Sequence, residues 1–118
     1  MRIIKNQIKL SELEEMAQKM FGDLVKAVVD VEKKIMAVDG ELHADEEGLL
    51  LQNGSKQTNL WGINIYPELY GSKDFIEFDS MINLRPSQAN RSRGIENPKT
   101  QKIILEITNN LIANDNTA

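Results

Sequence analysis

The period of the hydrophobic pattern changes close to Gly22, and this change constrains the fold more than any other feature of the sequence. Before it, apolar residues recur every three or four positions, as in an amphipathic helix. From Val25 to Val31 every second residue is apolar, which is typical of a strand. We therefore predict a helix over residues 11–22, opened by a capping box of Ser11 and Glu14, and followed directly by a strand.

A hairpin and a short helix are predicted next. After a polar break, residues 35–38 form the returning strand, which closes in a tight turn at 39–40. Residues 41–54 fit two structures, because they begin with strand-like alternation and end in Asn-Gly, which also suits a hairpin. We favour a helix over 45–53, since its first turn is acidic and the helix dipole favours negative charge there.

Two more strands and a final helix complete the pattern. Residues 60–66 and 75–85 alternate between apolar and polar side chains, and a proline follows each run. Asn97 and Pro98 are a typical N-cap and first residue of a helix. The resulting order, α-β-β-α-β-β-α, predicts an α+β fold. We expect an antiparallel sheet of about four strands with the helices on one face and the other face partly open to solvent.

The composition excludes several classes of protein. The 118 residues include no cysteine, so disulfide frameworks and thiolate chemistry are excluded. No stretch approaches the ~20 apolar residues of a membrane span, and no secretory signal is visible. A net charge of −4 makes nucleic acid an unlikely partner. We expect a cytoplasmic protein with a single domain over residues 1–113 and a frayed polar tail over 114–118.

Hydrogen-bonding side chains are concentrated between Asn83 and Gly94. This segment holds three arginines and no acid, although the chain as a whole is acidic. Because the arginine fork suits carboxylates and phosphates, the segment predicts a site for a small anionic ligand. The residues assigned to this site are Arg85, Ser87, Gln88, Asn90, Arg91, Ser92 and Arg93. The alternative is a solvated loop whose arginines pair with acidic side chains elsewhere in the protein.

A polar face of the sheet is predicted to extend this site. Alternation places Asn64 and Tyr66 on one side of their strand. It places Glu77, Asp79, Asn83 and Arg85 on one side of the strand over 75–85. If the two strands are neighbours, these side chains come within reach of one another and join the ligand-binding set.

His43, the single histidine, is the candidate catalytic residue, because the ordinary pKa of histidine lies near neutrality. Glu41, Asp45 or Glu77 could orient the ring or act as a second carboxylate. Developing negative charge could be stabilised by Arg85, Arg91 and Arg93. Glu41, His43 and Asp45 would share one face of an extended strand, yet one histidine without cysteine argues against zinc, and we predict no metal site. No glycine-rich phosphate loop is present, and we predict no cofactor.

Several segments between Val28 and Arg93 are distinctive as sequence. They are Val29–Glu32, Ile35–Val38, Glu41–Asp45, Leu60–Asn64, Ile82–Gln88 and Asn90–Ser92. In these segments the chain resembles a small, uncharacterised family of prokaryotic proteins. The resemblance implies a small prokaryotic domain and no particular activity.

Three functions are consistent with these patterns. The leading hypothesis is a domain that binds a phosphate-bearing ligand through its arginine-rich loop and hydrolyses it with His43. The second is a non-catalytic module that recognises a protein partner or a second copy of itself, since arginine is enriched at interfaces. The third, a ribonuclease-like component, is disfavoured by the acidic sequence, whose isoelectric point is near 5.0.

Overall fold

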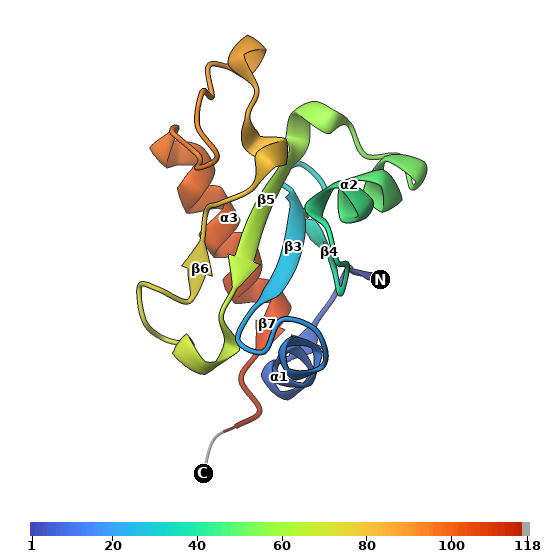
Figure 1. The fold of residues 1–118 in the computed structure, drawn as a ribbon, viewed down its shortest axis with the longest axis vertical. Helices are drawn as coiled ribbons and strands as arrows, with labels where there is room; N and C mark the ends of the chain where they lie inside the picture. The colour runs from blue at the N-terminus through green and yellow to red at the C-terminus, as the bar shows by residue number, and fades with distance from the viewer. Residues whose placement is uncertain (117–118) are drawn as a thin grey trace.

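A five-stranded antiparallel sheet lies at the centre of the computed structural model, which describes residues 1–116 (Figure 1). In sheet order its strands are β1 (Arg2–Ile4), β4 (Ile35–Val38), β3 (Val25–Asp30), β5 (Leu60–Ile65) and β6 (Ile76–Glu77). The predicted α+β class and antiparallel sheet are confirmed. The sheet has one strand more than expected, because the first residues pair with β4.

A separate pair of short strands joins the two ends of the chain. Strand β2 (Ile8–Lys9) runs parallel to β7 (Ile112–Ala113), so the start of the first helix lies beside the end of the last one. Asp115 then accepts hydrogen bonds from the backbone and the hydroxyl of Ser11, at 3.0 and 2.5 Å. Of the tail expected to fray, residues 117–118 lie outside the described residues.

Helices cover both faces of the sheet, and the prediction that they lie on one face is wrong. Helices α1 (Leu10–Lys19) and α3 (Pro98–Leu111) pack on the larger apolar cluster. Helix α2 (His43–Gln52) packs on the other face, where Leu50 meets Val28, Ala37 and Leu60. Because apolar side chains of β3, β4 and β5 project from this second face as well, a helix is needed to remove them from water.

The helix ends follow the sequence in part. Helix α3 begins as predicted, with Pro98 in its first turn and the Asn97 side chain accepting a hydrogen bond from Lys99 N at 2.9 Å. The favoured helix in the ambiguous segment is also confirmed, and it starts two residues earlier, at His43. The capping box of Ser11 with Glu14 is not formed. Glu12 instead accepts a hydrogen bond from Lys9 N at 3.4 Å.

The strand predicted over residues 75–85 is wrong for most of its length. Pairing with β5 stops at Glu77, and two single-turn 3₁₀ helices follow, at Met81–Asn83 and Pro86–Gln88. The Ser80 hydroxyl starts the first of them by accepting a hydrogen bond from Ile82 N at 3.2 Å. The chain thus leaves the sheet edge early and continues beside the first residues of β5 (Figure 1).

Gly62 of β5 is what allows this segment to pack so closely. Its backbone N–H and C=O are both bound by the side chain of Asn83, at 2.8 and 2.9 Å. A Cβ atom on Gly62 would lie 2.5 Å from the Cβ of Ser80. The carboxamide of Asn83 therefore takes the place of a strand partner, and only glycine leaves room for it.

Glu46 is a buried acid beneath the turn that precedes α2. It is fully buried, and its Oε2 accepts a hydrogen bond from Gly40 N at 2.9 Å. Its Oε1 has no hydrogen-bond partner within residues 1–116. Burial raises the pKa of Glu46 from 4.5 to about 9, so the carboxyl group is protonated at neutral pH.

We predict opposite effects of alanine at two glycines. Gly62→Ala should destabilise the fold by about 1–3 kcal/mol, because the new methyl group overlaps Ser80. Gly48→Ala is the matched control, since its Cβ meets no atom within 4 Å and α2 gains helix propensity worth about 1 kcal/mol. Urea unfolding followed by the fluorescence of Trp61 measures both. Equal stability of the two variants would contradict the close packing at Gly62.

We also predict that Glu46→Gln removes a pH dependence of stability. The folded state holds the Glu46 proton more tightly than the unfolded state does. The contribution of Glu46 to stability is therefore fully present below pH 4.5 and is lost as the pH rises toward 9. The stability of the glutamine variant relative to wild type should accordingly increase across that range. Urea titrations at several pH values measure it, and Glu41→Gln, an exposed change of the same charge, is the control. Parallel pH profiles for wild type and Glu46→Gln would show that Glu46 ionises normally.

Candidate functional site

A pocket with both polar and apolar lining residues lies between the start of α2 and the segment that follows β6. Its volume is about 210 Å³. The charged and polar side chains that line it come from β3, α2, β5 and the segment after β6: Lys26, His43, Asn64, Asp79, Ser80 and Arg93. Four of these six residues belong to the predicted site set. The pocket therefore brings together parts of two predictions, the polar sheet face and the histidine.

The N-terminus of α2 is the first element of this pocket. Its N-cap residue is Leu42, whose apolar side chain cannot accept the hydrogen bonds that serine or aspartate would accept there. Leu42, His43 and Ala44 all line the pocket. Because backbone N–H groups at a helix start are unpaired and carry partial positive charge, this end of the pocket attracts anions. Arg93 adds a full positive charge, and so does Lys26, whose Nζ lies over the ring of Phe21 at 4.8 Å from its centroid.

His43 is fixed in one protonation state by its surroundings. Its Nε2 lies 2.8 Å from the carbonyl oxygen of Ile63, which can only accept, so Nε2 carries a proton. Burial lowers the pKa of His43 below 6.5, and the nearby Lys26 and Arg93 lower it further. The ring is therefore neutral at pH 7, with Nδ1 as its acceptor nitrogen.

Glu41 and Asp45 do not join His43. Both carboxylates are exposed, whereas the His43 side chain is buried, because the segment is the start of a helix and not an extended strand. No group of three or more His, Cys, Asp or Glu side chains is placed to hold a metal ion within residues 1–116. The histidine thus stands in the pocket without a carboxylate from either of these positions.

Asn64, Tyr66, Glu77 and Asp79 lie together on the α2 face of the sheet. Asn64 Nδ2 donates to Glu77 Oε1 at 2.9 Å and to the backbone oxygen of Asp79 at 3.4 Å. The Tyr66 hydroxyl donates to the same Glu77 oxygen at 2.9 Å. Burial, together with this contact to Glu77, raises the pKa of Tyr66 to about 12, so the hydroxyl stays a donor. The side chain of Asn64 is only 7% exposed, and its Oδ1 has no partner among the described residues.

Asn83 and Arg85 are bound elsewhere in the protein. Asn83 clamps Gly62 and also donates to Arg93 O at 3.0 Å. The guanidinium of Arg85 stacks on the ring of Trp61, 4.0 Å from its centroid, and donates to the backbone oxygens of Gln57 and Leu60. Alternation along a strand cannot locate these two residues, because the strand has already ended.

Asn90 organises the rest of the arginine-rich segment. Its Nδ2 donates to Asn83 O at 2.6 Å and Gly94 O at 2.8 Å, and its Oδ1 accepts from Glu96 N at 2.8 Å. Gln88 donates to Thr58 O at 3.1 Å. Most of the hydrogen-bonding capacity that predicted an anion site is thus directed at carbonyl groups of the same chain.

The remaining residues of that segment lie at the surface. Ser87, Arg91 and Ser92 are exposed, and the backbone N–H of Arg91 donates to the carboxylate of Glu96. Arg93 pairs with Asp79 through Nε at 2.7 Å, which leaves its two terminal nitrogens for other partners. Within the described chain, Arg93 is the arginine of this segment that reaches the pocket at α2.

Lys26 and Leu42 line the candidate site, and sequence reasoning identified neither of them. Lys26 interrupts a run of valines and alanines in β3 and lies directly across from Asn64 on β5. A charged residue within an otherwise apolar strand could have marked the polar end of the second sheet face. Leu42 could not be identified from the sequence, because it matters only through a missing interaction: its side chain forms no capping hydrogen bond with the start of α2.

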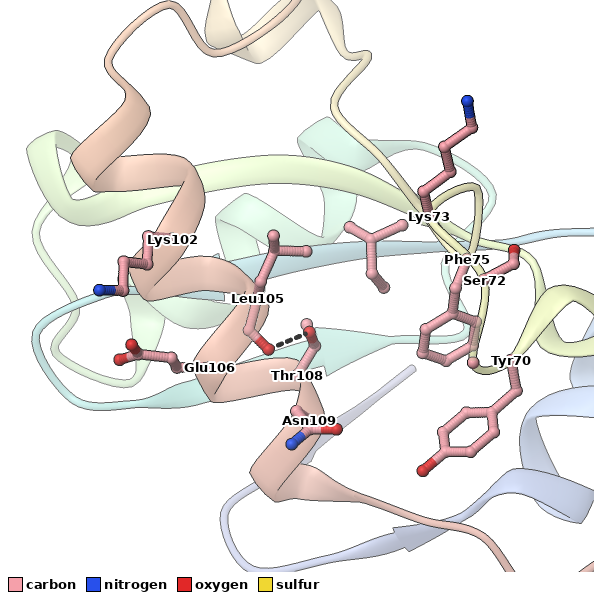
Figure 2. Close-up of a pocket in the computed structure, with 11 residues that line it drawn as sticks. Tyr70, Ser72, Lys73, Phe75, Lys102, Leu105, Glu106, Thr108 and Asn109 are labelled. Carbon is pink, nitrogen blue, oxygen red and sulfur yellow. Dashed lines mark hydrogen bonds between the residues drawn. The ribbon is translucent and has the colours of Figure 1, made fainter.

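A larger hollow of about 590 Å³ lies between α3 and the loop before β6. Figure 2 shows Leu105 of α3 on one side of this hollow and the rings of Phe75 and Tyr70 on the other, whereas Lys73 and Lys102 extend outward. The hydroxyl of Thr108 is already bonded to Leu105 O at 3.1 Å. This surface offers apolar contact but no converging polar groups, so we place the candidate site at the smaller pocket.

Comparison with known proteins identifies the family and nothing closer. No curated protein and no solved structure matches the chain. In residues 1–116, no helix has the length and hydrophobicity needed to cross a membrane. A family model described as "Protein of unknown function (DUF5674)" matches residues 2–111, which is nearly the whole chain. The protein therefore belongs to this uncharacterised family.

Proposed function

We propose that the protein binds a small molecule bearing an oxyanion, such as a phosphate or carboxylate group, in the pocket at the start of α2. The observation that carries this proposal is the gathering of an uncapped helix N-terminus, Lys26 and Arg93 around one hollow. Backbone amides at a helix start bind oxyanions directly, and the two cations add charge-assisted hydrogen bonds.

The charges of the pocket support an anion over a cation. Lys26 and Arg93 line it against the single carboxylate of Asp79, which already pairs with Arg93. The partial charge of the α2 dipole has the same sign as the two cations. The proposed site uses Arg93 from the arginine-rich segment, whereas Arg85 and Asn90 support it by holding that segment in place.

Binding without turnover is the form of the proposal that the contacts favour. Hydrolysis would require a base and a group that orients it. His43 is oriented by the carbonyl group of Ile63, which fixes its tautomer. Glu41 and Asp45, the carboxylates expected to assist it, are exposed instead. We therefore assign His43 to the wall of the site, where its neutral ring can contact the ligand.

A protein-interaction module is the second candidate. The observation that favours it is the apolar hollow along α3, whose rim exposes Leu105 by 44% and Tyr70 by 36%. Exposed apolar groups beside a groove are typical of surfaces that bind protein partners or a second copy of the chain. This surface and the pocket at α2 have no lining residue in common, so the two functions are compatible.

Two arginine variants should separate the site from its support. Arg93→Ala should weaken binding of glycerol phosphate about tenfold or more, since a hydrogen bond to a charged group is worth about 1.5–3 kcal/mol. It should change stability by less than about 1 kcal/mol, because its ion pair with Asp79 is half-exposed. Arg85→Ala should do the reverse, lowering stability by about 1–3 kcal/mol with affinity unchanged. Calorimetric titration and urea unfolding measure the two quantities. Full affinity in Arg93→Ala would contradict the proposed site.

A carboxylate at the N-cap of α2 should raise the stability of the fold and abolish ligand binding. Leu42→Asp should stabilise the fold by about 1 kcal/mol, because a carboxylate caps the free N–H groups and complements the dipole. The same carboxylate should abolish glycerol phosphate binding by occupying the anion position. Leu42→Ala removes the exposed side chain without capping the helix and should bind normally. Thermal unfolding and calorimetry measure these effects. An aspartate variant that is more stable and still binds phosphate would place the ligand elsewhere.

A further inference from the structure

We infer that the ligand of the pocket at α2 is an amphipathic oxyanion, whose charged group pairs with Arg93 and whose apolar part covers Leu42 and Met81. The inference rests on the proposed function and specifies its ligand. It starts from the exposure of these two apolar side chains. Within residues 1–116, Met81 (62% exposed) and Leu42 (54%) are, with Met1, the most exposed of the large apolar residues, and both line this one pocket.

Each of the two apolar side chains is held in place by a buried neighbour in the chain. Leu42 directly precedes His43, whose ring is buried and bonded through Nε2 to a backbone carbonyl group of β5 at 2.8 Å. Met81 begins the 3₁₀ turn that is capped by the hydroxyl of Ser80. Ile82 of the same turn packs against the apolar cluster beneath α2. The surface that Leu42 and Met81 offer is thus built into the fold before a ligand arrives.

The lining of the pocket combines charged and apolar side chains. Arg93 pairs with Asp79 through Nε, so its terminal nitrogens remain for a ligand, and Lys26 adds a second positive charge. A bare oxyanion would use these cations and leave the apolar lining in water. That apolar lining consists of Leu42, Ala44, Met81 and Ile82. A ligand complementary to the whole pocket therefore carries an apolar group attached to its oxyanion.

Charge and size define the class of this ligand. The cations of the pocket outnumber its one carboxylate, so an apolar amine would be repelled. Hydroxyl groups in place of the apolar part would face side chains that offer no strong hydrogen bond. The volume of about 210 Å³ suits an oxyanion with a chain of a few carbon atoms. The ligand class is thus a phosphate monoester or a carboxylate with a short hydrocarbon chain.

Homologous ligands test the inference on the wild-type protein. The probes are methyl, ethyl, propyl and butyl phosphate, with acetate, propionate, butyrate and valerate as the carboxylate series. Calorimetric titration should show affinity rising about two- to fourfold with each added methylene group in one series, because each group buries further apolar surface against Leu42 and Met81. Propyl phosphate should likewise bind more tightly than glycerol phosphate, its hydroxylated counterpart. The series that binds more tightly identifies phosphate or carboxylate as the source of the oxyanion.

The outcomes separate the inference from the proposed function. Affinities that do not change with chain length in either series would overturn the apolar part of the site while leaving the oxyanion site in place. No binding by any of these compounds would overturn the oxyanion site itself, and the inference with it. Self-association of the protein that is lost in Met81→Gln would also overturn the inference, since a second copy of the chain would then cover the apolar side chains.

Variants provide the second measurement. Met81→Gln keeps an unbranched side chain of similar length but makes it polar. It should weaken binding of butyl phosphate about threefold or more and leave methyl phosphate unchanged. Met20→Gln is the matched control, because Met20 is 39% exposed and does not line the pocket, and it should keep the wild-type affinities. Both changes are at exposed positions, so the fold should be retained. Wild-type affinity for butyl phosphate in Met81→Gln would overturn the inference.

Discussion

The contact between Asn83 and Gly62 is the interaction on which the rest of the structure depends. A carboxamide has one donor side and one acceptor side, so it can bind both backbone groups of a strand residue as a neighbouring strand would. By doing so with a side chain, the protein ends its sheet at β6 and still leaves no unpaired backbone at Gly62. The chain that would have continued the strand is free to turn, and it carries Asp79 and Arg93 to the start of α2.

The asparagines of this segment form a support for the site. Asn90 binds the carbonyl groups of Asn83 and Gly94, and Asn83 binds that of Arg93, so the backbone on both sides of Arg93 is held. Such bonds are directional, and each one satisfies a buried carbonyl group that water cannot reach. These hydrogen bonds therefore fix the position of Arg93 relative to the sheet, although its segment has little regular secondary structure.

Local patterns predicted the elements well and their three-dimensional relations poorly. The hydrophobic period located β3 and β4, and Asn97-Pro98 marked the start of α3, because these signals depend on neighbours in the sequence. The second buried face was missed because the alternation from Val25 to Val31 indicated one apolar face, whereas Val28, which projects from the opposite face, is buried as well. The composition of residues 83–94 correctly marked a place rich in hydrogen bonds. Composition cannot tell a donor that binds a ligand from one that binds a carbonyl of its own chain.

The start of α2 shows the physical conflict that a binding site creates. An apolar, 54%-exposed Leu42 at the N-cap leaves the helix start uncapped, where serine or aspartate would stabilise it. The same helix buries Glu46 with one oxygen unpaired. Both features are unfavourable for folding. A protein selected for stability alone would remove them easily, so their presence in one ten-residue helix supports a function at this end of the molecule.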